Sequence, residues 1–438
     1  MNQAQSSAAI ETIAERAQDH VDATRLAASL AALAQFGGRD DGGVSRETLT
    51  EIDLAARRHL IDKARELGCQ VGIDHCGNLF FRRAGSADLP PVLTGSHADT
   101  QPVGGKYDGA YGVLAGLEVI AALNAAGIET LRPIEVVSWT NEEGSRFGPG
   151  AMGSSAFVDP DRLPGYREAT DPAGIRFGDA LDAALAACKD VAHVSMRRPM
   201  SACVELHIEQ GPVLEAADVP LGVVTGIQAV RWFRIECAGT MAHAGTTPMA
   251  VRRDAMAVAV AIAQDLYALA PRTAQAPDIP ELRLTLGQWT VVPNSVNTIP
   301  GKVTFTVDMR CLDDAALDRA EAALRAACMR HAPGPEAVAI ARFFHRAPTH
   351  FPESMLAPIE RACARASLNA GRAQPMRLTS GAFHDAMYMA DHCPTAMIFV
   401  PSKNGISHNA AEDTAAVDLF LGAQALAYTV AELASRPA

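Results

Sequence analysis

The sequence predicts an α/β fold: a mostly parallel sheet flanked by helices, with a smaller α+β domain inserted into it. Three observations lead to this prediction. Apolar, strand-like runs alternate with helical patterns in the first part of the chain, and polar residues follow directly after the strands. In the middle, apolar and polar residues alternate, as in an antiparallel sheet with one solvated face. The first kind of pattern then returns toward the C-terminus.

The first domain consists of helices and short buried strands. Apolar residues at helical spacing predict helices at residues 6–36, 49–67, 110–126, 354–370 and from 415 onward. Short apolar runs predict strands at PVLTGSH (91–97), IEVVSWT (134–140) and TAMIFVP (395–401). Parallel neighbouring strands need a long crossover connection, which is usually a helix. Helices between the strands therefore predict a mostly parallel sheet.

The inserted domain is expected to hold a four-stranded antiparallel sheet and two helices. Strand patterns include RWFRIECAGT (231–240), LRLTLGQWTVV (282–292) and GKVTFTVDMRC (301–311), and helix patterns cover 252–269 and 313–331. A Pro-rich loop is expected at 271–280. We therefore divide the chain into residues 1–226 with 342–438, and an insertion at 227–341.

Composition excludes several classes of protein. The 438 residues carry a formal net charge of −12, which disfavours nucleic acid or an anionic membrane as a partner. The sequence contains no run of 18 or more apolar residues, so no membrane span is expected. The first 20 residues lack the basic and apolar segments of a secretory signal. Nine cysteines without a CxxC motif favour reduced thiols. We expect a cytoplasmic protein.

Five residues of metal-binding type each lie in a short polar motif next to an apolar run. They are His97 in GSHADT, Asp108 in KYDGAYG, Glu143 in TNEEGSRFG, His207 in ELHIEQG and His408 in GISHNAAE. Three histidines and two carboxylates suit two divalent ions such as zinc. A pair of such ions sharing a carboxylate generates a hydroxide at neutral pH. The chain is therefore predicted to be a dinuclear metallohydrolase.

Each signal taken alone also has an ordinary structural explanation. His97 and Asp99 could be a surface histidine beside a turn aspartate, or a ligand whose ring or loop Asp99 holds. Asp108, at the start of an apolar helix, could be an N-cap or the carboxylate that bridges two ions.

Glu142 and Glu143 are more informative. Adjacent carboxylates after an apolar strand repel each other and lose hydration, which is costly for a purely structural pair. One can bind a metal while the other acts as general base, because neighbours on an extended segment point in opposite directions. His207 alternates with Leu206 and Ile208, so it lies on the polar face of its strand.

Two residues of the insertion are open to both interpretations. His243, in TMAHAGTTPM, could be a surface loop histidine or a donor to a developing oxyanion. Arg310, at the end of a strand, could be a surface charge or a fork that clamps a substrate carboxylate.

Together these motifs resemble the zinc-dependent aminoacylase and carboxypeptidase superfamily. They resemble most its ureido-hydrolase branch of N-carbamoyl-L-amino acid hydrolases, allantoate amidohydrolases and β-ureidopropionases. The resemblance extends from about residue 30 to the C-terminus, with the motifs in the expected order. His207 in HIEQGP is typical of this branch, because peptidase relatives usually have a carboxylate there.

The resemblance implies roles for individual residues. His97 and His207 would hold one ion, Glu143 and His408 the other, with Asp108 as the bridge and Glu142 as the catalytic base. We also count Asp99, in the motif of His97, among the catalytic residues. It also implies two divalent ions per subunit, zinc first and manganese, cobalt or nickel as alternatives.

The insertion would then be a lid and dimerisation domain. The resemblance implies that its His243 contacts the substrate in the partner subunit of a homodimer. It implies further substrate contacts at Gln210, Asn297, Arg310 and His384. Phe383 departs from the small residue typical of its motif, which leaves the side-chain preference open.

The expected reaction is hydrolysis of the ureido C–N bond of an N-carbamoyl-L-amino acid, giving the amino acid, CO2 and ammonia. Allantoate amidohydrolase and β-ureidopropionase are the nearest alternatives. A dipeptidase or aminoacylase is disfavoured by His207, and a non-catalytic, metal-stabilised binding protein by the intact Glu142.

Overall fold

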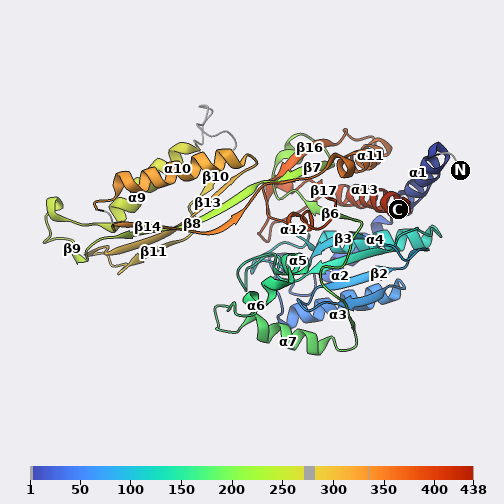
Figure 1. The fold of residues 1–438 in the computed structure, drawn as a ribbon, viewed down its shortest axis with the longest axis horizontal. Coiled ribbons are helices and arrows are strands. Elements are labelled where there is room, and N and C mark those ends of the chain that lie inside the picture. Colours follow the sequence, from blue (N-terminus) through green and yellow to red (C-terminus); the bar gives the residue numbers. More distant parts are fainter. Residues whose placement is uncertain (1–2, 271–281, 335, 438) are drawn as a thin grey trace. The chain divides into compact units, whose positions relative to one another are not determined.

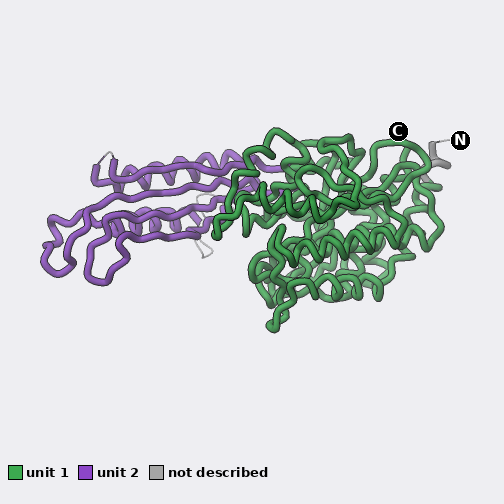
Figure 2. Tube along the Cα trace, turned by 90° about the horizontal axis from the view of Figure 1, so that it is seen from below, with its two compact units in different colours: residues 1–225, 351–438 green, residues 226–350 purple. Residues whose placement is uncertain are grey.

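The fold was analysed in a computed structural model that describes residues 3–270, 282–334 and 336–437. The chain divides into two compact units, residues 1–225 with 351–438 (unit 1) and residues 226–350 (unit 2), coloured separately in Figure 2. The sequence placed the second boundary at 341, whereas the structural division lies at 350. The reason is β14 (Val338–Arg346), which pairs with β8 (Ala229–Ala238) inside unit 2.

Unit 1 is built on one mixed sheet whose strands follow the order β7–β17–β6–β3–β4–β2–β1–β5, and both β16 and the two-residue β15 (Thr349–His350) pair with β7. Its four central strands are parallel and fully buried: β17 (Thr395–Val400), β6 (Ala202–Ile208), β3 (Val92–His97) and β4 (Ile134–Trp139). The outer strands are β1 (Gln70–Ile73), β2 (Leu79–Arg83), β5 (Ala192–His193), β7 (Gly222–Ile227) and β16 (Met376–Ser380). The mostly parallel sheet is thus confirmed.

Helices pack around this sheet (Figure 1). The main ones are α1 (Gln3–Asp19), α2 (Ala23–Leu33), α3 (Glu51–Glu66), α4 (Ala110–Ala125), α7 (Phe177–Ala187), α11 (Glu353–Asn369) and α13 (Ala416–Ser435). The helix expected at 6–36 is two helices, because the Asp22 carboxylate accepts the N–H groups of Thr24 and Arg25 and caps α2.

The apolar helices α4 and α13 form the centre of unit 1. Helix α4 packs closely on the sheet at Gly112, where a Cβ would lie 2.5 Å from the carbonyl oxygen of Leu206. Helix α13 is long and apolar enough to cross a membrane, but it is largely buried against α1, α11 and α4. It is a core helix.

Unit 2 is an antiparallel sheet covered by α9 (Ala255–Leu269) and α10 (Asp314–His331). The sheet order is β10–β13–β8–β14, with β13 at Lys302–Cys311. The strand expected at 282–292 is two strands, β10 (Arg283–Thr285) and β11 (Trp289–Val292), which pair with opposite halves of β13. The described part of the sheet therefore has five strands rather than the four expected, because β10 and β11 both lie beside β13. The break occurs where the Gln288 N–H donates to the side chain of Thr306.

The longest strand of unit 2 that was not located from sequence is β14, which follows α10. The two-residue strands β9 (Ala242–His243), β12 (Thr298–Ile299) and β15 (Thr349–His350) were not located either. The Pro-rich loop expected at 271–280 lies outside the described residues.

Candidate metal centre

The five metal-type residues lie at one edge of the sheet in unit 1. His97 ends β3, His207 lies near the end of β6, and Glu143 follows β4. Asp108 precedes α4, and His408 lies in the loop after β17. The carboxyl ends of parallel neighbouring strands meet at the same edge of a sheet. Residues far apart in sequence are therefore brought together here.

Asp108 lies between two groups of donors. Its Oδ1 is 3.2 Å from Nε2 of His207 and 3.7 Å from Nε2 of His97. Its Oδ2 is 3.3 Å from Nε2 of His408, which is itself 3.4 Å from Oε2 of Glu143. Each group of three offers donor atoms within 4.8 Å of one another. One carboxylate oxygen thus faces each group, so Asp108 is placed where a carboxylate could be shared by two ions.

The alternative role of Asp108 as a helix cap is not observed. The residue before α4 is Gly109, and no side chain caps this helix. Gly109 has φ +63°, and a Cβ there would lie 2.4 Å from the His97 ring. Glycine is needed at this position because the backbone passes directly against the His97 ring.

Backbone carbonyls orient both buried histidine rings. Nδ1 of His97 lies 2.9 Å from the carbonyl oxygen of Asp99, and Nδ1 of His207 lies 2.9 Å from that of Ile208. A carbonyl only accepts, so Nδ1 carries a proton and Nε2 is the ring nitrogen that faces Asp108. The two Nε2 atoms on the Asp108 side are therefore set up to bind a metal.

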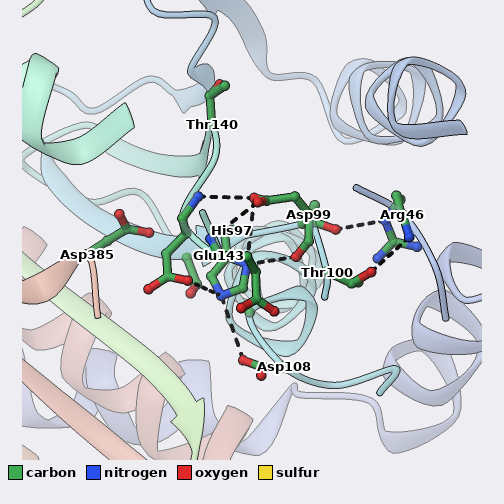
Figure 3. A network of polar contacts seen from close by, with 12 residues as sticks. Arg46, His97, Asp99, Thr100, Asp108, Thr140, Glu143 and Asp385 are labelled. Atoms are coloured by element: carbon green, nitrogen blue, oxygen red, sulfur yellow. Dashed lines mark hydrogen bonds and ion pairs between the residues drawn. The ribbon is translucent and has the colours of Figure 1, made fainter. Parts of the chain in front are cut away.

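The side chain of Asp99 holds the segment that carries the two glutamates. Its two oxygens lie 3.4 and 3.3 Å from the backbone N atoms of Glu142 and Glu143. Of the two roles considered from sequence, the carboxylate supports the loop and the backbone carbonyl holds the ring. Figure 3 shows Asp99 between His97 and Arg46, with Asp385 on the opposite side of the network.

Electrostatics indicate that a cation belongs at this centre. Burial raises the pKa of Glu142 well above its usual range, and the nearby carboxylates of Asp385 and Glu143 raise it further. Burial and Asp108 raise the pKa of Glu143 to about 8. Repulsion among buried carboxylates is relieved when a cation lies between them. The donor set present fits divalent zinc, manganese, cobalt or nickel.

Glu142 does not belong to either group of three. It is buried, and its Oε2 lies 3.5 Å from Nε2 of His97. A carboxylate beside the donors but outside both groups can exchange a proton with a reacting molecule there.

Two residues predicted to contact substrate also lie at this edge of unit 1. The Gln210 side chain donates to Oδ2 of Asp108 at 2.9 Å. The His384 ring lies 4.6 Å from the His207 ring, and its Nε2 is hydrogen-bonded to Ser380 Oγ at 2.9 Å.

Four further polar residues of this site were not identified from sequence. They are Gln101, Glu205, Asp385 and Glu412. Gln101 donates to both oxygens of Glu143, and Glu205 accepts from Ser96 and from the Ala386 N–H. The signals for three of them were present: Glu205 shares the polar strand face with His207, Asp385 follows His384, and Glu412 ends the motif GISHNAAE.

Unit 2 carries the remaining predicted residues in two separate places. His243 and Asn297 lie together, because β9 (Ala242–His243) pairs with β12 (Thr298–Ile299) and the Ala244 N–H donates to the Asn297 carbonyl. Arg310 is at the other end of β13, where it pairs with Val230 and contacts Asp308. Eight positions of β13 separate Arg310 from Lys302, which follows β12 closely in the chain, and they correspond to about 26 Å of strand.

The turn after β9 fixes the tautomer of the His243 ring. The N–H groups of Gly245 and Thr246 donate to its Nδ1 at 3.0 and 3.2 Å. Nδ1 is then the acceptor, so the neutral ring carries its proton on Nε2. His243 is exposed, so Nε2 is presented outward as a donor.

Metal-type donors gathered at the strand ends of an α/β unit, together with an α+β insertion, are typical of metal-dependent hydrolases. The chain belongs to the peptidase family M20/M25/M40, whose model matches residues 93–432.

Named relatives narrow this class. An N-carbamoyl-L-amino-acid amidohydrolase of Rhizobium meliloti is 39% identical over 423 residues, which is 94% of this chain and 97% of the relative. An allantoate amidohydrolase of Bacillus subtilis is 35% identical, covering 92% and 95% of the two chains. A crystal structure of a hydantoinase/carbamoylase family amidase from Burkholderia vietnamiensis is 43% identical, with a TM-score of 0.84 over 95% and 98%. The chain is thus an enzyme of the amidohydrolase kind.

Proposed function

We propose that this enzyme hydrolyses the ureido C–N bond of N-carbamoyl-L-amino acids, giving the amino acid, CO2 and ammonia. The observation that carries the proposal is the position of Asp108 between two donor groups, one of which contains His207. The R. meliloti relative, which matches along nearly the whole chain, is named for this reaction.

Two divalent ions would be held in these groups, one by His97 and His207 and the other by Glu143 and His408, with Asp108 shared. Zinc suits this mixture of imidazole and carboxylate, and manganese, cobalt and nickel are the alternatives. When bound, such ions acidify water and polarise a carbonyl group.

Glu142 would serve as the base. Its buried carboxylate lies beside the donor atoms, so it can take a proton from the attacking water and then donate it to the leaving nitrogen. Asp99 would hold Glu142 and Glu143 in place through their backbone N–H groups. Gln210 and His384 would contact the substrate from unit 1.

The lid residues favour a homodimer. His243 would donate from Nε2 to the developing oxyanion, and Asn297 and Arg310 would bind the substrate carboxylate. A small ureido acid does not span the roughly 26 Å of strand that separates Arg310 from the paired strands β9 and β12, where His243 and Asn297 lie. We therefore propose that His243 and Asn297 act in the active site of the partner subunit.

The surface around His243 and Asn297 supports this assembly. Large apolar side chains near His243 and Asn297 are exposed: Met241, Met249, Val251 and Val296. Exposed apolar groups gathered at one place mark a surface that is covered in an assembly.

The cellular compartment is proposed to be the cytoplasm. All nine cysteines are buried free thiols, which fits a reducing environment. The acidic net charge fits small-molecule substrates, with neither nucleic acid nor membrane as partner.

Allantoate is the second candidate substrate, because the 35% identical B. subtilis relative is named for it. The deciding experiment measures ammonia release from N-carbamoyl-L-methionine and from allantoate, with zinc, manganese or cobalt added to metal-free enzyme. Faster turnover of allantoate would move the assignment to that substrate. Glu142→Gln should abolish turnover while metal content stays unchanged, and substantial remaining activity would exclude Glu142 as the base.

Mixing two inactive variants tests the dimer. Glu142→Gln and His243→Ala subunits each lack one part of the site, but a mixed dimer contains one complete site. Activity should therefore reappear on mixing and subunit exchange. Continued inactivity, with mixed dimers demonstrated, would show that His243 acts within its own subunit or not at all.

A further inference from the structure

Glu412 is a buried carboxylate with no part in the mechanism above. Its Oε1 accepts the backbone N–H groups of Tyr107 and Asp108 at 3.0 and 3.1 Å. Its Oε2 accepts the hydroxyl of Ser407 at 2.9 Å. Both oxygens are thus occupied by donors from the protein, so Glu412 is placed to hold other residues.

The residues it holds belong to the two loops that meet at the metal centre. One loop carries Asp108, and the other carries Ser407 and His408. Ser407 Oγ also lies 3.1 Å from Oδ2 of Asp108, the oxygen that faces His408. Glu412 therefore joins the backbone of Asp108 to the loop that carries His408, 300 residues further along the chain.

The protein leaves space for this carboxylate. A Cβ on Gly105 would lie 2.0 Å from Oε1 of Glu412, so any larger residue at 105 would displace it. Glycine at position 105 thus allows the loop before Asp108 to pass directly against Glu412.

The ligand on this side needs such support. The side chain of His408 is 51% exposed, compared with 2% and 1% for His97 and His207. His408 also has φ +52° and lies in a loop outside any strand or helix. Sheet hydrogen bonds therefore fix His97 and His207, but not His408.

We infer that Glu412 is a positioning residue that aligns Asp108 with His408 and so builds the site of the second ion, the one between Glu143 and His408. The inference rests on the proposed dinuclear function. Residues that orient ligands in this way typically contribute 10–100-fold to metal affinity.

Metal titration tests this role without depending on activity. Metal-free wild type and Glu412→Ala are titrated with Zn²⁺ and with Mn²⁺ by calorimetry, and bound metal is counted after gel filtration. Wild type should take up two ions per chain. The variant should keep the first affinity and lose about 10–100-fold in the second.

Conservative variants separate positioning from a general effect on folding. Glu412→Gln should restore most of the second affinity, because its amide oxygen can accept the same two N–H groups while its NH2 group donates to Ser407. Glu412→Asp is one methylene shorter and should lose affinity as Glu412→Ala does; it serves as the test if Glu412→Ala does not fold.

Glu215→Ala is the matched control. Glu215 also accepts a backbone N–H of the loop after β17, from Asn404 at 2.6 Å, but it does not contact Asp108. This variant should bind both ions as wild type does. A folded Glu412→Ala or Glu412→Asp variant with both wild-type affinities would overturn the inference and leave the proposed function intact. A wild-type chain that binds fewer than two ions would overturn both.

Discussion

The two halves of the candidate metal centre share Asp108 but are built in different ways. His97 and His207 lie on neighbouring strands of a buried parallel sheet, and each ring is oriented by a backbone carbonyl. Glu143 and His408 lie in loops. Polar side chains hold these loops: Gln101 on Glu143, and Ser407 with Glu412 beside His408.

The half with His97 and His207 is therefore held in place by the sheet, whereas the half with Glu143 and His408 is held by side-chain contacts. Sheet strands keep their geometry without a ligand, because their hydrogen bonds and packing are already in place. A loop has fewer such restraints. We therefore expect the two halves to differ in how firmly they hold an ion, and four predictions test this difference.

The largest effect is expected at the residue common to both halves. Asp108→Ala removes a donor from each group, so binding of both ions should weaken and turnover should fall at least about 1000-fold. Metal counting and steady-state ammonia release measure this. Asp108→Asn keeps the shape without the charge and serves as control. A variant that lost only one ion would show that Asp108 does not bridge.

The next effect separates the halves directly. When metal-loaded wild type is mixed with excess chelator, metal should leave in two phases, with the His408 half emptying first because it is exposed. His408→Ala should retain about one ion and lack the fast phase, whereas His207→Ala should lack the slow phase. Stopped-flow detection of released metal follows both. Loss in a single phase from wild type would contradict the comparison.

The pKa values of the histidines should differ even between His97 and His207, which belong to the same half of the centre. Burial would lower the pKa of His207, but Asp108 outweighs it and raises this pKa to about 9; Asp108 likewise raises that of His408 to about 9. The folded pKa values exceed the unfolded value of about 6.5. This stabilisation is therefore full below pH 6.5 and is lost as the pH rises to 9.

Unfolding of metal-free protein at a series of pH values measures this loss, and stability should fall between pH 6.5 and 9. Metal competes with these protons, so metal affinity should rise over the same range. Burial lowers the pKa of His97 to about 4, so its contribution is instead lost toward acid. Metal-free stability that rose between pH 6.5 and 9 would contradict the pairing of Asp108 with His207 and His408.

The smallest effect is expected at a single supporting contact. Gln101→Ala removes the side-chain donor to Oε2 of Glu143 but leaves the backbone donor to Oε1. The second ion should bind several-fold to about 10-fold more weakly, and the first should be unaffected. Calorimetric titration resolves the two. Equal weakening of both ions would mean that the halves are not independently supported.

Much of this arrangement could be predicted from sequence because it depends on local pattern. The runs PVLTGSH and IEVVSWT are apolar segments that end in polar residues, and they form β3 and β4 as expected. By contrast, β14 escaped prediction; it is a largely exposed strand of the insertion and lacks a buried apolar run. The break within 282–292 arises from pairing with β13, which no local pattern reveals.

The sequence by itself determined the fold class, the donor residues and the family resemblance, because residue types and apolar periodicity are local properties. Only the tertiary structure decided that Asp108 faces two donor groups rather than capping α4, and that the Asp99 carboxylate holds a loop rather than a ring. It also revealed Glu412 as the link between two loops. These roles depend on contacts between segments that meet only when the parallel strands align, and no sequence spacing encodes such distances.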